Sequence, residues 1–506
     1  MSDHKTRSRG AGGYFRTKTV EQSIRDTEEP DHALTRSLSA LDLTVFGVGV
    51  VIGTGIFVLT GAVAKEAAGP AVAISFAVAG LVCGLAALCY AEFASTVPVA
   101  GSAYTFSYAS LGELPAWIIG WDLVLEMALG CAVVAVGWSG YIRSLLDNAG
   151  WNLPQALSGT SQETGFGFDL LAFLLVLALT AVLVAGMKLS ARVTSVVVAI
   201  KVGVVLVVIV VGAFLIKAEN YRPFIPPAEE TTGGGSDIGA PLVQLLFGYT
   251  PSTFGVMGIF TAAAIVFFAF IGFDIVATAA EETRNPQRDL PRGIIGTLII
   301  CTVLYVAVSA VVTGMQKYTL LSVDAPLADA FKETGHPFWA GLISFGAAVG
   351  LTTVCMILLL GQTRVFFAMS RDGLLPRTFS KVHPHFRTPY RSTILLGVAA
   401  AVIAGFTSIS ELAELVNIGT LFAFVVVAIG VVVLRRTRPD LPRSFRTPLV
   451  PFLPAVSVLA SLWLMLNLSG ETWLRFLIWM AAGFLIYFLY GRRNSRMSAT
   501  TDRLDH

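Results

Sequence analysis

Four glycines interrupt an apolar stretch near the N-terminus. It reads Phe46-Gly-Val-Gly-Val-Val-Ile-Gly-Thr-Gly-Ile-Phe57. Glycine lacks Cβ and adopts backbone angles that an α-helix excludes, so the chain can unwind here and direct amides and carbonyls sideways. Facing lipid, those groups would be unsatisfied, so the break must be buried in protein or line a watery cavity. We therefore predict a binding site formed by Gly53, Thr54, Gly55 and Ile56.

A second apolar stretch carries a glycine and an acid midway along. It reads Phe267-Phe-Ala-Phe-Ile-Gly-Phe-Asp-Ile275, and its Ile271-Gly-Phe-Asp-Ile275 corresponds to Ile52-Gly-Thr-Gly-Ile56 of the first stretch. Interrupted helices at matching positions in two halves of a chain are typical of inverted-repeat transporters. The pairing predicts that the two breaks form one site at the repeat interface.

The two breaks have complementary chemistry. Amides freed at Gly53, Thr54 and Gly55 begin the outer half of the first span, where partial positive charge favours a carboxylate. Carbonyls near Phe268 and Ile271, which we assign to the inner half of the sixth span, accept from an ammonium group. Together they match the backbone of an α-amino acid. The alternative is that the glycines only allow close helix packing.

Lys201 is a basic residue deep inside an apolar stretch. It lies about ten residues into a predicted span, hence roughly 15 Å deep, where its side chain reaches neither surface easily. Removal from water disfavours a charged ammonium group, so this lysine can release a proton. We predict a proton-coupling role; the alternative is a structural lysine that stays paired with a carboxylate or with carbonyls.

Acidic residues also occur inside the predicted spans. Glu126 and Asp274 are candidates to pair with a cationic substrate side chain, and Asp122 lies one helical turn before Glu126. Alternatively, these acids are protonated or hydrogen-bonded to helix ends. For Asp122, which we expect close to the membrane interface, we favour that alternative.

The composition is that of a polytopic membrane protein. Of 506 residues, 55% are hydrophobic and 13% charged, and the mean hydropathy is +0.73. Twelve apolar stretches are long enough, or nearly so, to cross a hydrocarbon core of ~30 Å as helices. They are residues 41–65, 71–95, 116–142, 168–187, 191–216, 256–280, 292–314, 338–367, 392–407, 412–434, 451–469 and 472–490.

Lysine and arginine concentrate on alternate loops, notably within 284–292, 364–391 and 435–446. The positive-inside rule therefore predicts a multi-pass protein of the cell membrane with both termini cytoplasmic. Topology accounts for the basic residues, so we expect membrane lipid and no nucleic acid as a partner. Residues 1–35 have no apolar core of a signal peptide, and we expect none to be cleaved.

No metal site, cofactor or catalytic residue is predicted. The five cysteines all fall within spans and show no CxxC spacing. HExxH, P-loop and nucleophile-elbow motifs are missing from the sequence, which argues against an integral-membrane enzyme. A binding sensor would be expected to carry a large soluble signalling domain, and we find none.

The matching breaks also divide the chain. We expect a disordered cytoplasmic tail over 1–33, a first repeat over 34–217, an extracellular loop over 218–255 and a second repeat over 256–434. Helices eleven and twelve occupy 435–490, and a cytoplasmic tail follows over 491–506. Each repeat holds five spans, an odd number, so the second enters the membrane from the opposite face. The charged residues between Glu281 and Arg292 could form a cytoplasmic gate or simply be exposed to solvent.

Three motifs resemble the amino acid–polyamine–organocation superfamily and, within it, the cationic amino acid transporter group. They are Leu41 to Phe57, Pro98-Val-Ala-Gly-Ser-Ala-Tyr-Thr-Phe106 and Phe270-Ile-Gly-Phe-Asp-Ile-Val-Ala-Thr-Ala-Ala-Glu-Glu-Thr-Arg-Asn-Pro286, and the resemblance runs from Leu34 to Arg446. It implies an all-α, LeuT-type five-plus-five inverted repeat with discontinuous helices one and six plus two additional helices. Mammalian members have fourteen spans, so twelve spans resemble a microbial homologue.

The resemblance also implies roles for single residues. Substrate carboxylate is expected at Gly53, Thr54 and Gly55, and substrate amine at carbonyls near Phe268 and Ile271. The ammonium of Lys201 stands where sodium sits in sodium-coupled relatives, which implies proton coupling. Glu126 and Asp274 lie beside the pocket, and Met356 resembles the pocket residue of span eight.

The expected function is secondary active transport of L-amino acids, with small neutral or cationic substrates and with protons as the coupling ion. The expected mechanism is alternating access around spans one and six, by a monomer or homodimer. The alternative is an exchanger of amino acids for amines, which needs no driving ion.

Overall fold

The computed structural model describes residues 38–97, 102–151, 154, 157, 167–186, 191–230, 238–248, 252–386 and 388–495. The predicted tail over 1–33 and all but the first five residues of the tail over 491–506 lie outside these ranges. So do residues 98–101 of the second family motif and part of the loop over 218–255.

Helices account for nearly all regular structure in the described residues, which confirms the predicted all-α class. The exception is one antiparallel pair of two-residue strands, β1 (Glu229–Glu230) and β2 (Ser252–Thr253). The longer helices are α2 (Ala40–Val51), α4 (Val72–Thr96), α6 (Glu113–Asn148), α7 (Leu170–Val184), α8 (Ala191–Ala213), α10 (Gly255–Val266), α11 (Pro286–Met315), α13 (Pro337–Arg371), α14 (Tyr390–Phe406), α15 (Ile409–Thr437), α16 (Phe452–Leu466) and α17 (Gly470–Ile486).

Short helices connect or extend them. They are η1 (Gly55–Leu59), α3 (Thr60–Val63), η2 (Ala64–Ala68), η3 (Gly69–Ala71), α5 (Ser102–Ser110), η5 (Ala218–Tyr221), α9 (Leu242–Phe247), η6 (Phe267–Phe270), η7 (Asp274–Glu282), η8 (Tyr318–Leu320), α12 (Pro326–Glu333), η9 (Arg377–Ser380), η10 (Tyr487–Gly491) and α18 (Arg492–Asn494). Of these, η1, η2 and η10 are π-helices.

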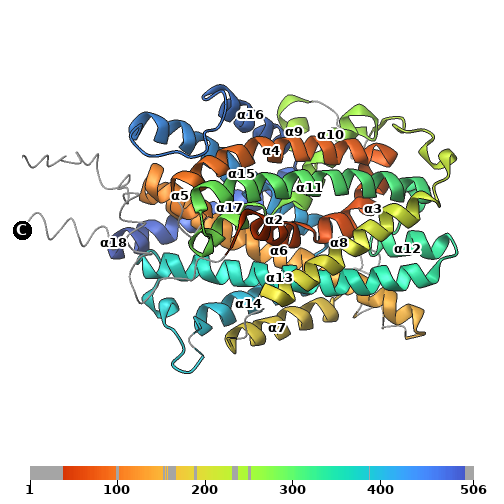
Figure 1. The fold of residues 1–506 in the computed structure, drawn as a ribbon, viewed down its shortest axis with the longest axis horizontal. Helices are drawn as coiled ribbons and strands as arrows, with labels where there is room; N and C mark the ends of the chain where they lie inside the picture. Colours follow the sequence, from red (N-terminus) through yellow and green to blue (C-terminus); the bar gives the residue numbers. More distant parts are fainter. Residues whose placement is uncertain are drawn as a thin grey trace, which may run out of the picture.

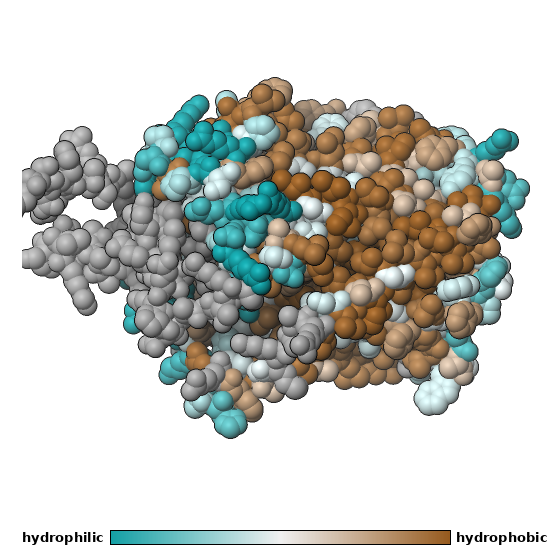
Figure 2. Space-filling view, viewed as in Figure 1, coloured by the Kyte–Doolittle hydropathy of each residue, from teal (hydrophilic) through white to brown (hydrophobic). Residues whose placement is uncertain are grey.

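Eight helical stretches in the described residues are long and apolar enough to cross a membrane, and four shorter apolar helices accompany them. Together they overlap every predicted span. The helices run side by side (Figure 1), and hydrophobic side chains cover the middle of the visible face while hydrophilic ones gather towards its ends (Figure 2). This distribution is that of a multi-pass membrane protein. The count of twelve crossings stays a prediction.

Small residues allow the helices to approach one another closely. Gly130 on α6 faces Leu358 on α13, and Gly361 on α13 faces Met127 on α6. Without a hydrophobic driving force in lipid, such close packing is a main source of helix association. The α6–α13 pair forms one wall of the site described below.

Both glycine-rich stretches are interrupted. The first helix ends at Val51, the backbone of Ile52 is extended, and helical structure resumes at Gly55 as η1. The second runs as α10 and η6 to Phe270, turns through Ile271 to Phe273, and resumes as η7. Gly272 has a φ of +110°, which L-residues with side chains rarely adopt.

The two breaks lie against each other near the middle of the bundle, where α2 is labelled in Figure 1. A Cβ on Gly55 would collide with the Cα and Cβ of Ala269 in η6. Only glycine therefore permits this approach, which explains the residue type at position 55. The two breaks are therefore in direct contact.

Candidate functional site

The two breaks line one cavity of about 30 Å³. Its walls are Val50, Val51, Gly53, Thr54, Gly55, Glu126, Met127, Gly130, Val134, Phe268, Ile271, Asp274, Ile275, Val354 and Leu358. A cavity of this size holds about one or two water molecules and is too small for an amino acid. The cavity would therefore have to widen to hold a solute of that size.

Seven of the nine residues predicted for the substrate site line this cavity, and two do not. Those seven are Gly53, Thr54, Gly55, Glu126, Phe268, Ile271 and Asp274. Ile56 is buried in η1, and Met356 is buried in α13, away from the cavity lining. Val354 and Leu358 line it from α13 instead. These two residues are four apart and share a helix face, whereas Met356, midway between them, points elsewhere.

Polar atoms in the cavity lack partners. The hydroxyl of Thr54 and Oε2 of Glu126 are buried without a hydrogen-bond partner among the described residues. A buried polar atom that makes no hydrogen bond costs about 1–3 kcal/mol. Such a cost is expected where a ligand supplies the missing partner, so both atoms mark positions for polar groups of a substrate or for water.

The carbonyls near Phe268 belong to the other half of the sixth span than the inner half to which we assigned them. Phe268 belongs to η6, which continues α10 from Gly255 at the end joined to the 218–255 loop. Our assignment to the inner half was wrong, because a span preceded by five others begins on the outer face under the predicted topology. These carbonyls therefore end the half-helix on the side of that loop.

Lys201 lies behind the first break, in α8. Its side chain is fully buried, and Nζ donates to the carbonyl oxygens of Gly49 at 2.6 Å and Ile52 at 3.3 Å. These carbonyls belong to the last turn of α2, where the helix dipole places partial negative charge. Within the described part of the chain, no carboxylate forms an ion pair with Lys201. In this conformation its partners are carbonyls.

Asn417 supports the second break and was not found by sequence reasoning. It lies on α15, is fully buried, and its Nδ2 donates to the carbonyl of Ala264 at 2.8 Å and that of Ile265 at 3.1 Å. The last carbonyls of an interrupted helix need such donors. An asparagine within an apolar stretch was the signal, and it went unused because its partners lie far away in the sequence.

Asp122 differs from our expectation. It is fully buried, and neither carboxyl oxygen has a hydrogen-bond partner among the described residues. Oδ1 lies against α15, since a Cβ on Gly419 would be 2.6 Å away from it. The expected hydrogen bonding to a helix end is therefore wrong for Asp122. With Glu126 and Asp274 it adds a third buried acid to this region.

The ends of the broken helices also meet at the surface. Leu38, just before α2, donates its N–H to the carbonyl of Glu282 at 2.9 Å and accepts from the N–H of Arg284 at 2.9 Å. This short parallel bridge joins the start of α2 to the end of η7. Backbone hydrogen bonds, as well as packing, therefore join the start of α2 to the end of η7.

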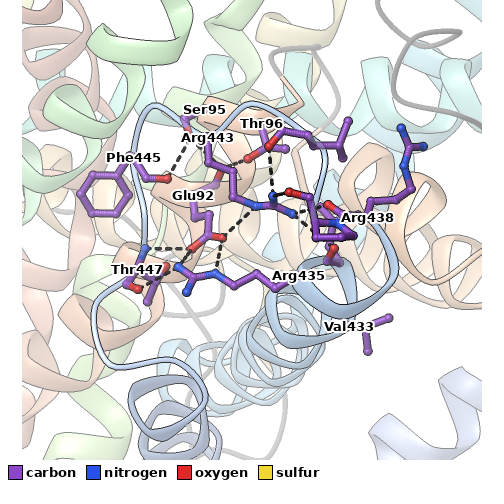
Figure 3. Close-up of polar contacts among 12 residues, drawn as sticks. Glu92, Ser95, Thr96, Val433, Arg435, Arg438, Arg443, Phe445 and Thr447 are labelled. Atoms are coloured by element: carbon purple, nitrogen blue, oxygen red, sulfur yellow. Dashed lines mark hydrogen bonds and ion pairs between the residues drawn. The ribbon is translucent and has the colours of Figure 1, made fainter.

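A polar cluster fixes the end of α4 nearby (Figure 3). Glu92 accepts from Arg435 Nε at 2.8 Å and Nη2 at 2.7 Å, and from the N–H of Thr447 at 2.8 Å. Arg443 adds an ion pair at 3.4 Å and donates to the carbonyls of Leu434 and Arg438 at the end of α15. The cluster joins α4, α15 and the segment before α16.

Comparison with known proteins shows the family of the chain. The model of the amino acid permease family matches residues 38–489. The chain belongs to this family. The permease is 48% identical over 491 residues to the branched-chain amino acid permease BcaP of Bacillus subtilis (strain 168), covering 96% of this chain and 99% of the relative.

Two further relatives span a similar share of the permease. The methylthioribose transporter of Bacillus subtilis (strain 168) is 47% identical over 485 residues, 96% of this chain and 99% of the relative. The vacuolar cationic amino acid transporter 4 of Arabidopsis thaliana is 33% identical over 598 residues, 96% of each chain. These matches confirm the predicted superfamily and cationic amino acid transporter group. The permease is thus a membrane transporter and not an enzyme.

Proposed function

We propose that the permease is a secondary active transporter of L-amino acids that couples uptake to protons. The observation that carries the proposal is that both broken helices contribute to one cavity, with Gly53, Thr54 and Gly55 from the first break and Phe268 and Ile271 from the second. Few solutes other than an α-amino acid need both an anion and a cation site so close together.

The carboxylate is assigned to the start of η1. The amides of Gly53, Thr54 and Gly55 precede this half-helix, and the unpartnered hydroxyl of Thr54 lies beside them. The ammonium group is assigned to the carbonyls of Phe268 and Ile271 at the end of η6. Two half-helix ends of opposite polarity then hold the two charges of the substrate.

Lys201 is the proposed coupling residue. When charged, its ammonium makes charge-assisted hydrogen bonds to the last turn of α2, and such bonds are about twice as strong as neutral ones. After the proton leaves, the same carbonyls are held less strongly. The protonation state of Lys201 thereby sets how strongly the last turn of α2 is held. This hold must weaken when the site opens.

The substrate side chain is proposed to enter the space between α6 and α13. Apolar residues dominate this wall, namely Met127, Val134, Val354 and Leu358, while Glu126 and Asp274 add carboxyl groups. The wall suits small aliphatic side chains, and its two carboxyl groups could also pair with a cationic side chain. Relatives of nearly equal identity bear names that differ in substrate, so relatedness alone selects none.

Transport by the purified full-length protein in lipid vesicles tests the proposal. We expect labelled L-leucine, L-alanine or L-arginine to accumulate under an inward proton gradient without sodium. Lys201→Ala should abolish gradient-driven accumulation, because it removes the ammonium group that donates to the carbonyls of Gly49 and Ile52. Lys65→Ala is the matched control, since it removes an exposed lysine and should leave uptake unchanged.

Three results would contradict parts of the proposal. A sodium requirement would exclude proton coupling through Lys201. Uptake that occurs only in vesicles preloaded with amino acid or amine would favour the exchanger. Competition by methylthioribose but by no amino acid would exclude a site built for both a carboxylate and an ammonium group.

A further inference from the structure

The hydroxyl of Tyr305 lies between the two broken helices. Tyr305 is fully buried on α11, and its Oη is 2.6 Å from the carbonyl oxygen of Val51 and 2.8 Å from that of Ala269. Val51 is the last residue of α2, and Ala269 lies in η6 directly before the second break. A single side chain therefore contacts the backbone of both breaks.

Aromatic packing fixes the ring of Tyr305. The ring of Phe76 on α4 lies 5.7 Å from it at 64°, and the ring of Phe270 in η6 lies 5.2 Å from it at 59°. Edge-to-face and tilted contacts at such distances are favourable. The oxygen is held in place by these contacts, while its hydrogen can still rotate towards either carbonyl.

The hydroxyl has one hydrogen and two acceptors. A phenol donates one hydrogen bond, so at any moment one of the two carbonyls goes without this donor. The carbonyl that goes without the hydroxyl is held by one hydrogen bond fewer. Positive charge placed near the end of η6 would make the carbonyl of Ala269 a poorer acceptor and favour donation of the hydroxyl to Val51.

Tyr305 and Lys201 hold the same turn of α2. The carbonyls that Lys201 contacts, those of Gly49 and Ile52, flank the carbonyl of Val51. A change at the end of η6 can therefore reach the lysine through one side chain.

We propose that Tyr305 is a positioning residue that couples occupancy of the substrate amino-group site on η6 to the turn of α2 held by Lys201. The inference rests on the proposed function. In the empty protein the hydroxyl is shared between the two breaks. An ammonium group on the carbonyls of Phe268 and Ile271 places positive charge beside the carbonyl of Ala269 and makes it a poorer acceptor. The hydroxyl then donates to Val51 and stabilises the first break while the substrate is bound.

Removal of this one hydroxyl is the test, with Tyr141 as the matched control. Tyr141 is equally buried, and its Oη donates to the carbonyl of Phe57 in η1 at 2.6 Å, beyond the break. Tyr305→Phe and Tyr141→Phe thus each remove a hydroxyl that donates to the backbone of the first broken helix. Both are compared with the wild-type full-length chain in lipid vesicles, using labelled L-leucine, L-alanine and L-arginine.

The readout is the ratio of proton-driven accumulation to exchange in preloaded vesicles. A merely structural role would lower both activities together and would not change this ratio. We expect Tyr305→Phe to reduce it by about tenfold, as the loss of ~1.4 kcal/mol of coupling implies. Tyr141→Phe should leave it within about twofold of wild type, with a similar melting temperature for both variants.

Opposite results identify which claim fails. If wild type transports and Tyr305→Phe keeps the wild-type ratio, or both variants lose it in parallel, the role of Tyr305 is refuted. If wild type transports none of the three amino acids, the proposed function fails and the inference with it. Should Tyr305→Phe not fold, 3-fluorotyrosine at position 305 serves instead. Its fluorine NMR signal should shift on addition of the transported amino acid while that of 3-fluorotyrosine at 141 should not, and a constant signal would overturn the inference.

Discussion

At the scale of single residues, Gly55 and Gly53 have different reasons to be glycine. A Cβ on Gly55 would collide with the backbone of Ala269, whereas a Cβ on Gly53 would meet Val354 at an ordinary distance of 3.6 Å. Gly55 is therefore needed for the two broken helices to touch. Gly53 is buried in the bend of the break, where the neighbouring side chain leaves room for a Cβ.

This difference predicts the stability of two alanine variants. Gly55→Ala should lower the free energy of unfolding by about 1–3 kcal/mol, the usual cost of overpacking a filled core, and should abolish transport. Gly53→Ala, the matched control, should retain nearly wild-type stability whatever its effect on binding. Thermal unfolding of the detergent-solubilised proteins measures both. Equal melting temperatures for the two variants would show that the breaks do not approach as described.

At the scale of helices, the sequence predicts where the chain breaks but not what holds each break. Glycine at positions 53, 55 and 272 is visible as a local pattern, and the structure interrupts both helices there. The donors to the freed carbonyls come from distant helices, as with Asn417, and no local period reveals them. Met356 was chosen by resemblance, whereas the lining residues Val354 and Leu358 follow from the rotation of α13, which sequence alone does not fix.

The role of Asn417 can be measured. Asn417→Ala should lower the free energy of unfolding by about 1–3 kcal/mol, because it leaves the carbonyls of Ala264 and Ile265 without a buried donor. Asn494→Ala is the control, since that asparagine donates to the carbonyl of Tyr490 at an exposed position. It should change stability by less than about 0.5 kcal/mol. Comparable losses for both variants would argue that the break needs no side-chain donor.

At the scale of the whole molecule, the polar cluster around Glu92 joins α4, α15 and the segment before α16 (Figure 3). The carboxylate of Glu92 is buried and faces two arginines, one largely buried and one about a quarter exposed. Removing the charge of one partner lowers the stability of the fold, because the remaining buried charges are left without an opposite charge. The cluster therefore contributes to the packing of helices that lie far apart in the sequence.

Charge removal at Glu92 should destabilise the fold. We expect Glu92→Gln to lower the free energy of unfolding by on the order of 2–4 kcal/mol. Glu471→Gln is the matched control: Glu471 pairs with Arg475 at 3.1 Å, but both side chains are more than two-fifths exposed, and surface pairs are worth about 0–1 kcal/mol. Chemical denaturation compares the two. A milder effect at Glu92 than at Glu471 would contradict the proposed contribution.

The most direct test of the central claim is an experimental structure of the protein with a transported L-amino acid bound. We predict that the ligand lies between the two breaks, with its carboxylate on the amides of Gly53, Thr54 and Gly55 and its ammonium group on the carbonyls of Phe268 and Ile271. Ligand density away from the breaks, or two helices that run unbroken through this region, would contradict the account.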